Sequence, residues 1–244
     1  MKNSMCYFCS VLFLLLILGS NASAQESTSS MHFSLFGGIA LPQGDFGSTV
    51  RDNDKAGFAK TGFCAMAEGS KNLNENVLWV SSLAFALNSA DESAMKDPSD
   101  YWDEYSVSAG NYLTSWAMTG IGYETVISPT INLYGIGQLG LLLSSVPDVK
   151  ISANNSNDMG STTITSNITS KMGTSFAYGF GVGIKVNKFN IGLRYYSSEP
   201  EYEQTYKQSK TIVYSGISHT GENSETKKVQ MPASVLQLLF GINL

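Results

Sequence analysis

The sequence has few charged residues and few cysteines. Only 14% of its 244 residues are Asp, Glu, Lys or Arg, against roughly 25% in soluble domains, which excludes a disordered chain or a coiled coil. Three cysteines are too few for a disulfide scaffold. The net charge of −5 provides no overall attraction for nucleic acid, so we expect no nucleic-acid partner. Apart from the first residues, long apolar runs are also missing, and the apolar residues are spread along the chain.

The first 24 residues have the pattern of a signal peptide. Lys2 supplies the positive charge, an apolar run covers 11–18, and Ala22-Ser23-Ala24 forms a small-residue cleavage site. The run is shorter than the roughly 20 residues of a spanning helix. We therefore predict that 1–24 is removed and that 25–244 is the mature domain. Cys6 and Cys9 would leave with the signal peptide, and Cys64 would remain as a small residue within a strand.

From Met31 onward the apolar residues alternate with a period of two, which indicates strands. No long segment shows a helical apolar stripe, and many glycines interrupt the runs. The alternation predicts eight strands, located near residues 33–41, 61–67, 77–87, 113–125, 131–143, 176–186, 189–195 and 236–244.

Long and short connections alternate strictly between these strands. The short ones cover 70–76, 128–130 and 187–188, and the long polar ones cover 42–55, 88–111, 144–174 and 197–228. This order is typical of an all-β, eight-stranded antiparallel up-and-down barrel that spans a bacterial outer membrane, with turns toward the periplasm and loops outside.

The faces of the strands favour lipid contact. The apolar sets contain no Lys, Arg, Asp or Glu, whereas the strand charges fall on the opposite face. A soluble lipocalin-like barrel or a sandwich would have the reverse polarity, with apolar residues inside. Aromatic residues lie near both ends of the strands, as in the two girdles of a membrane barrel. We expect outer-membrane lipid to be the main partner of this surface.

The chain resembles small bacterial outer-membrane proteins. Its opening MHFSLFGGIALPQGDFG and its eight alternating strands are similar to the eight-stranded porin-like, outer membrane protein beta-barrel domain family of Bacteroidetes-type bacteria. The resemblance covers nearly the whole mature chain, is architectural, and implies insertion by the barrel assembly machinery. One departure is the C-terminus, which ends on Leu244 where many such barrels end on an aromatic residue.

Five charged residues on the inner face predict a polar network in the lumen. They are Lys60, Glu68, Glu124, Lys185 and Arg194. Buried charges need partners, so we expect Arg194 and Lys185 to pair with Glu68 or Glu124. Two alternatives stay open, namely a gate for a narrow conductance and plain packing of a closed lumen.

No motif predicts an enzyme, a cofactor or a metal site. The two histidines, His32 and His219, have no triad spacing, and His219 lies in a loop beside Ser215, Ser218 and Glu222. The acidic residues of 88–111 do not follow a calcium-loop pattern, although a loose divalent-cation site there stays open. The glycine alternation of 179–183 lacks the helix of a dinucleotide fingerprint and instead leaves room in the lumen.

The long connections suggest the role. The segment 144–174 is polar, β-branched and nearly uncharged. It is either a solvated loop or a continuation of its flanking strands into a protruding sheet, whose exposed edges can pair with partner strands. We therefore expect a structural or surface-interaction role such as adhesion, with the ligand unknown. The alternatives are a narrow porin-like channel and, after it, an outer-membrane barrel hydrolase.

Overall fold

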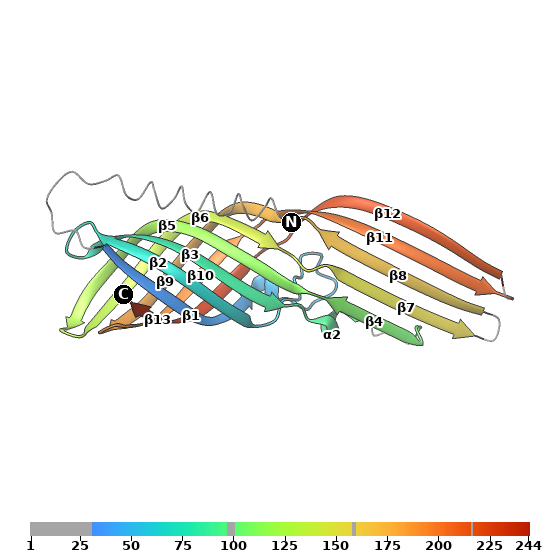
Figure 1. Ribbon diagram of the computed structural model, residues 1–244, viewed down its shortest axis with the longest axis horizontal. Helices are drawn as coiled ribbons and strands as arrows, with labels where there is room; N and C mark the ends of the chain where they lie inside the picture. Colours follow the sequence, from blue (N-terminus) through green and yellow to red (C-terminus); the bar gives the residue numbers. More distant parts are fainter. Residues whose placement is uncertain (1–30, 97–100, 158–159, 216) are drawn as a thin grey trace. The chain divides into compact units, whose positions relative to one another are not determined.

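The computed structural model describes residues 31–96, 101–157, 160–215 and 217–244 (Figure 1). The predicted signal peptide, with Cys6 and Cys9, lies outside them. None of the helices in these ranges is long and apolar enough to cross a membrane.

Eight strands form a closed antiparallel barrel in the order β1-β13-β10-β9-β6-β5-β3-β2, so the predicted fold class is confirmed. Barrel strands that follow one another along the chain lie side by side in the barrel. The first, β1, pairs with the last, β13, and closes it. The barrel strands are β1 (Met31–Gln43), β2 (Gly62–Asn72), β3 (Val77–Ser89), β5 (Asn111–Ser128), β6 (Ile131–Ser145), β9 (Gly173–Val186), β10 (Phe189–Ser198) and β13 (Ser234–Asn243). Each contains one of the eight segments predicted from the alternation, to within a residue or two at the ends.

A second sheet of five strands has the order β12-β11-β8-β7-β4. Its strands are β4 (Glu104–Ala109), β7 (Val149–Asn157), β8 (Gly160–Ser170), β11 (Glu201–Tyr214) and β12 (Ile217–Gln230). We call it the outer sheet. It forms within the long connections, where each of its strands adjoins a barrel strand in sequence: β4 with β5, β7 with β6, β8 with β9, β11 with β10 and β12 with β13 (Figure 1). The expected continuation of the strands around 144–174 is therefore present, and it extends to two further connections.

Among the described residues, two short helices also lie in long connections. The 3-10 helix η1 (Gly44–Gly47) follows β1, and α2 (Glu92–Met95) follows β3. The Asp91 side chain caps α2 by accepting a hydrogen bond from the Ala94 N–H.

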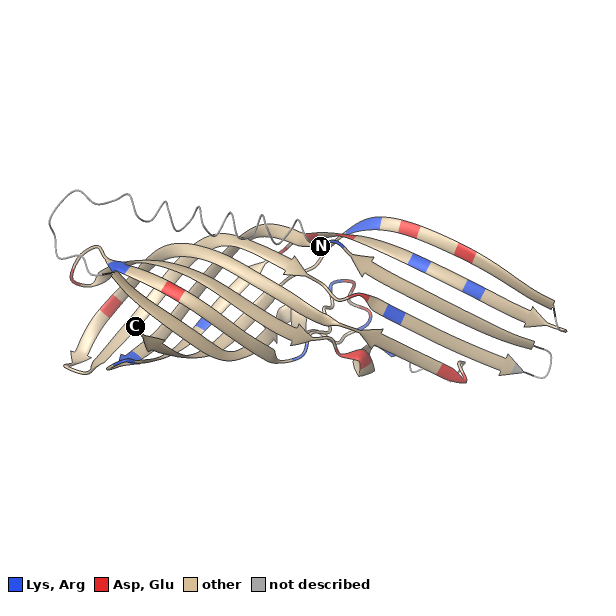
Figure 2. Ribbon diagram, in the orientation of Figure 1, with Lys and Arg blue, Asp and Glu red and all other residues tan. Residues whose placement is uncertain are grey.

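The barrel wall has the composition that lipid contact requires. The eight barrel strands contain five charged residues, Glu68, Lys71, Glu124, Lys185 and Arg194, and Lys71 lies next to the turn at the end of β2 (Figure 2). Large exposed side chains cover the outside instead, among them Leu139, Phe180, Val182, Ile191 and Phe240. Trp79, Tyr123 and Phe189 are exposed near the short turns, and Phe176 and Tyr178 near the other end, as the predicted aromatic girdles require.

A charge placed in this wall tests lipid contact. Leu139 lies midway along β6 and is 56% exposed. We expect Leu139→Arg to lower the free energy of unfolding from lipid vesicles by about 2–4 kcal/mol, because the guanidinium would lie near the bilayer midplane. The measurement is denaturant unfolding of the refolded protein, monitored by heat-modifiable gel mobility. Leu73→Arg is the matched control, since Leu73 is equally exposed but lies in a turn. Equal stability of both variants would contradict a lipid-facing wall.

Candidate functional site

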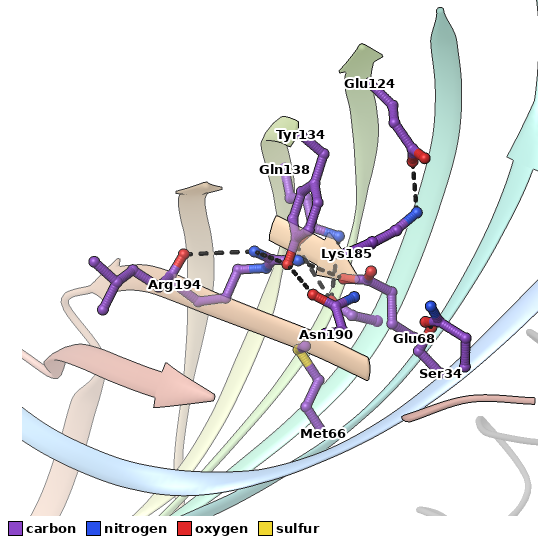
Figure 3. Close-up of polar contacts among 12 residues, drawn as sticks. Ser34, Met66, Glu68, Glu124, Tyr134, Gln138, Lys185, Asn190 and Arg194 are labelled. Carbon is purple, nitrogen blue, oxygen red and sulfur yellow. Dashed lines mark hydrogen bonds and ion pairs between the residues drawn. The ribbon is translucent and has the colours of Figure 1, made fainter. Parts of the chain in front are cut away.

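A buried ion pair crosses the barrel lumen (Figure 3). Arg194 on β10 donates through Nη2 to Glu68 Oε2 on β2 at 3.1 Å. The Arg194 side chain is fully buried and that of Glu68 is 8% exposed. From the sequence we expect Arg194 to pair with Glu68 or Glu124. In the barrel, where β1 and β13 separate β10 from β2, Arg194 pairs with Glu68.

Polar groups of two further strands, β6 and β3, and Asn190 of β10 surround this pair. Arg194 Nη1 lies 3.3 Å from Tyr134 Oη, and the guanidinium carbon lies 4.9 Å from the centre of the Tyr134 ring. Tyr134 in turn donates to Asn190 Oδ1 at 2.8 Å. Beside them, the Gln138 amide and the Ser82 hydroxyl exchange hydrogen bonds. Tyr134, Gln138 and Asn190 alternate with the outward apolar residues of β6 and β10, so the period of two also places them on the inner face.

A second ion pair lies nearer the short turns. Lys185 Nζ donates to Glu124 Oε2 at 2.5 Å, and Asn132 Nδ2 donates to the other carboxylate oxygen at 2.7 Å. The side chains of Lys185 and Glu124 are 20% and 17% exposed. This pair is therefore partly solvated, unlike the pair of Arg194 and Glu68.

Lys60 lies apart from the other four predicted residues. It precedes β2 at the opposite end of the barrel, where its ammonium is 3.1 Å from Asp91 Oδ1. The pKa of the Asp91 carboxyl is lowered to about 2, chiefly because the Ser93 hydroxyl and the Ala94 N–H donate to it, with a smaller effect from Lys60. Lys60 thus helps to fix the connection after β3 rather than the polar cluster in the lumen.

Glycines on β9 make room for the large lumen side chains. A Cβ atom at Gly179 would meet the Tyr196 ring, one at Gly181 would meet the Arg194 side chain, and one at Gly183 would meet Tyr134 Oη. These glycines alternate with outward apolar residues, so the stripe lies on the lumen side. The alternation that superficially resembles a nucleotide-binding motif has this packing role.

An apolar layer fills the lumen between the polar cluster and the end of the barrel where the long connections lie. Trp116 and Tyr196 stack with ring centres 5.4 Å apart, and both side chains are almost completely buried. Tyr196 Oη donates to Met66 Sδ at 3.4 Å, while Leu142 and Leu239 complete the layer. Trp116 was missed by sequence reasoning because the alternation of its strand is irregular. Trp116 lies at an even position of β5, whereas the exposed residues Leu113 and Ile121 lie at odd positions, and this difference could have predicted that Trp116 points inward.

The connection after β1 covers the outer end of the lumen. Phe46, in η1, is 2% exposed and packs edge-to-face against Tyr112 at 5.1 Å. Backbone hydrogen bonds from Gly57 to Asp45 and from Ala59 to Phe46 hold the connection in place, and the Tyr112 hydroxyl donates to the Gly57 carbonyl. Together with the Trp116 layer, this plug fills the end of the lumen on the side of the long connections.

The two histidines lie on different sheets. His32 is in β1 opposite Ser70, near a short turn, and His219 is in β12 opposite Ile212. His219 therefore belongs to a strand rather than to the loop expected from the sequence. Among the described residues, no group of three or more His, Cys, Asp or Glu side chains is placed to hold a metal ion.

The outer sheet has one long open edge. Its edge strand β12 pairs with β11 along fourteen residue positions, and nearly all of its residues are exposed. The opposite edge strand, β4, has six residues.

Ion pairs of Lys228 with Glu201 and of Lys171 with Glu203 join the strands where the outer sheet begins, and Tyr202 donates to the Ser144 hydroxyl at 2.8 Å. The Glu201 carboxylate raises the pKa of Lys228 by accepting its hydrogen bond.

Comparison with known proteins finds similar solved structures but no related sequence. No family model and no curated protein matches the chain, so the Bacteroidetes-type family stays a prediction. The attachment invasion locus protein Ail of Yersinia pestis has a TM-score of 0.42 at 13% identity, with coverage of 88% of this chain and 97% of Ail. A major outer membrane protein from Thermus thermophilus has a TM-score of 0.42 at 10% identity, covering 88% and 100%. LpxR from Salmonella typhimurium has a TM-score of 0.21 at 9% identity, covering 86% and 99%. With scores this low, the fold assignment depends on the strand pairing of this chain.

Removal of the Glu68 charge tests the buried pair. We expect Glu68→Gln to lower the free energy of unfolding by about 3–5 kcal/mol, because Arg194 would stay buried without a carboxylate. Glu124→Gln is the control and should cost about 1 kcal/mol, since that pair is partly solvated. The measurement is denaturant unfolding in lipid vesicles. A larger loss for Glu124→Gln than for Glu68→Gln would refute this order.

Conductance distinguishes a gate from packing. We expect the wild-type protein to show no discrete current steps in a planar bilayer, because the Trp116 layer and Phe46 close the lumen. Arg194→Ala should be equally silent, since it leaves both closures in place. Stable current steps in Arg194→Ala alone would identify the ion pair as a gate.

Proposed function

We propose that the protein is a bacterial outer-membrane barrel that carries a surface-binding sheet. The apolar wall and the two aromatic girdles support insertion into the outer membrane. The strict alternation of tight turns and long connections supports an orientation with the outer sheet outside the cell, as in other bacterial barrels. The filled lumen favours an anchoring role for the barrel over transport.

The single observation that carries the proposal is the open edge of the outer sheet. The strand β12 has fourteen residues, pairs only with β11 among the described strands, and is exposed along its length. A free strand edge presents unpaired N–H and C=O groups to which an extended polypeptide can add as a further strand. The charges of Glu222, Glu225, Lys227 and Lys228 lie along this edge and disfavour indiscriminate pairing. The partner we propose is therefore an extended polypeptide segment whose charges complement this pattern.

Two adjacent proline substitutions test strand addition. Successive N–H groups of a strand point to opposite edges, so in the pair Asn223→Pro and Ser224→Pro one variant loses a bond to β11 and the other loses only an open-edge donor. The variant that loses only the open-edge donor keeps the sheet intact. We expect it to bind an extended polypeptide no better than the barrel alone, because the edge can no longer pair continuously with an added strand. The assay is adhesion of bacteria displaying the protein to wells coated with reduced, carboxymethylated α-lactalbumin, an unfolded chain.

The control called the barrel alone, which keeps only the six-residue strand β4 of the outer sheet, replaces 146–172 and 199–232 with two-residue Asn-Gly turns. The Ala233 N–H bonds the Ser198 carbonyl and Ser144 pairs with Gly173, so both replacements join strands that already lie side by side. Heat-modifiable mobility checks that each variant remains folded. If bacteria displaying the barrel alone adhere as well as those displaying the wild type, the outer sheet is not the binding surface.

A further inference from the structure

The two faces of the outer sheet differ in chemistry. On one face, Thr205 and Thr211 of β11 align with threonines of both β12 and β8, and Ser209 aligns with Thr165 of β8. Thr205 bonds Thr226 at 3.0 Å and Thr211 bonds Thr220 at 3.1 Å, so these hydroxyls are paired with one another. The opposite face carries the apolar and aromatic residues of the sheet, including Tyr206, Ile212 and Tyr214. We call it the mixed face.

A hollow of about 180 Å³ lies on the mixed face, at the end of the sheet away from the barrel. Asn155 of β7, Thr162 of β8 and Ile212 of β11 form one row of its floor, because Thr162 is the register partner of both others. Tyr214 lies two residues beyond Ile212, and Tyr101 from the connection before β4 adds a second aromatic ring. The hollow is smaller than the ~300–1,000 Å³ of sites for drug-sized ligands, so it suits one ring of a longer molecule.

Contacts with β7 hold Tyr101 at the hollow. The Asn155 amide donates to the Tyr101 carbonyl, and Asp103 accepts a hydrogen bond from the Ser156 N–H at 2.6 Å. The Trp102 ring packs edge-to-face against Tyr101 with centres 4.9 Å apart. The aromatic ring is therefore presented by a backbone segment that is attached to the sheet at two points.

The described residues that line the hollow are uncharged, yet its aromatic side chains face water. Tyr101 is 66% exposed, Tyr214 is 59% exposed and Ile212 is 40% exposed. Exposed aromatic and aliphatic groups gathered in one hollow offer contact surface to a small ligand. Aromatic rings offer flat apolar surfaces to the C–H face of a sugar, while the Asn155 amide and the Thr162 hydroxyl can exchange hydrogen bonds with its hydroxyl groups. Among the described residues that line the hollow, none carries a charge that would select an acidic sugar.

We propose that this hollow binds one ring of a neutral glycan. The inference rests on the proposed function insofar as the outer sheet must face the exterior of the cell to meet such a glycan. It concerns a different part of the sheet from the β12 edge, so a glycan and an extended polypeptide could occupy the sheet together.

Binding of small neutral oligosaccharides to the purified full-length protein in detergent micelles tests the inference. The probes are lactose, maltotriose and chitotriose, with sialyllactose as the acidic counterpart, and the readout is saturation-transfer NMR. We expect at least one neutral probe to bind and Tyr214→Ala to weaken it by about fivefold, the effect of losing one ring contact. Tyr214→Phe should retain binding because the ring remains. Asn155→Ala should weaken it as well, since both an amide and the attachment of Tyr101 are lost.

Tyr206→Ala is the matched control. Tyr206 lies on the same face but outside the hollow, where its hydroxyl donates to Gln204 and Lys227 covers its ring, so its removal should leave glycan binding unchanged. Heat-modifiable mobility and protease resistance of the outer sheet check folding. Binding of sialyllactose alone would overturn the inference and indicate an anionic ligand. Absence of binding by all four probes, while adhesion through the β12 edge persists, would overturn the glycan site and leave the proposed function standing. Loss of both would refute both.

Discussion

The pairing of β1 with β13 is the constraint on which the rest of the structure depends. A strand in lipid has no water to satisfy its N–H and C=O groups, and each unpaired group costs several kcal/mol. The first and last strands of the described chain must therefore meet, and their register runs from Ser34 opposite Asn243 to Gln43 opposite Ser234. Closure converts an antiparallel meander into a barrel without edges and places both ends of the barrel domain at the side of the short turns.

Closure of eight strands also decides what the interior can contain. The lumen is just wide enough for side chains to fill, so every large residue inside needs space from a small one opposite. The glycine stripe of β9 supplies that space for Tyr134, Arg194 and Tyr196. A buried guanidinium in such a site needs a carboxylate, and Glu68 provides it. The result is a barrel whose lumen is filled by its own side chains.

Beyond the lipid the constraint no longer applies, because water can satisfy an open strand edge. Five of the barrel strands have neighbours in sequence that form the outer sheet, and β12 and β4 are its edges. The same hairpin pairing that is obligatory within the membrane thus continues as an open sheet outside it. The two faces and the long edge of that sheet provide distinct surfaces, one rich in hydroxyl groups, one with exposed tyrosines and one with free backbone groups.

The sequence by itself determined the eight barrel strands, their antiparallel order and the inward direction of Glu68, Arg194 and Gln138, because the period of two is a local property of each strand. It did not decide which charges pair across the lumen, or that Lys60 meets Asp91 instead, since those contacts depend on strand register and tilt around a closed barrel. The sequence pattern predicts a polar loop where β11 and β12 form, because both faces of β12 meet water and an exposed strand carries no apolar alternation. The plug at Phe46 and the hollow beside Tyr101 also came only from the tertiary structure, because segments distant in sequence meet there.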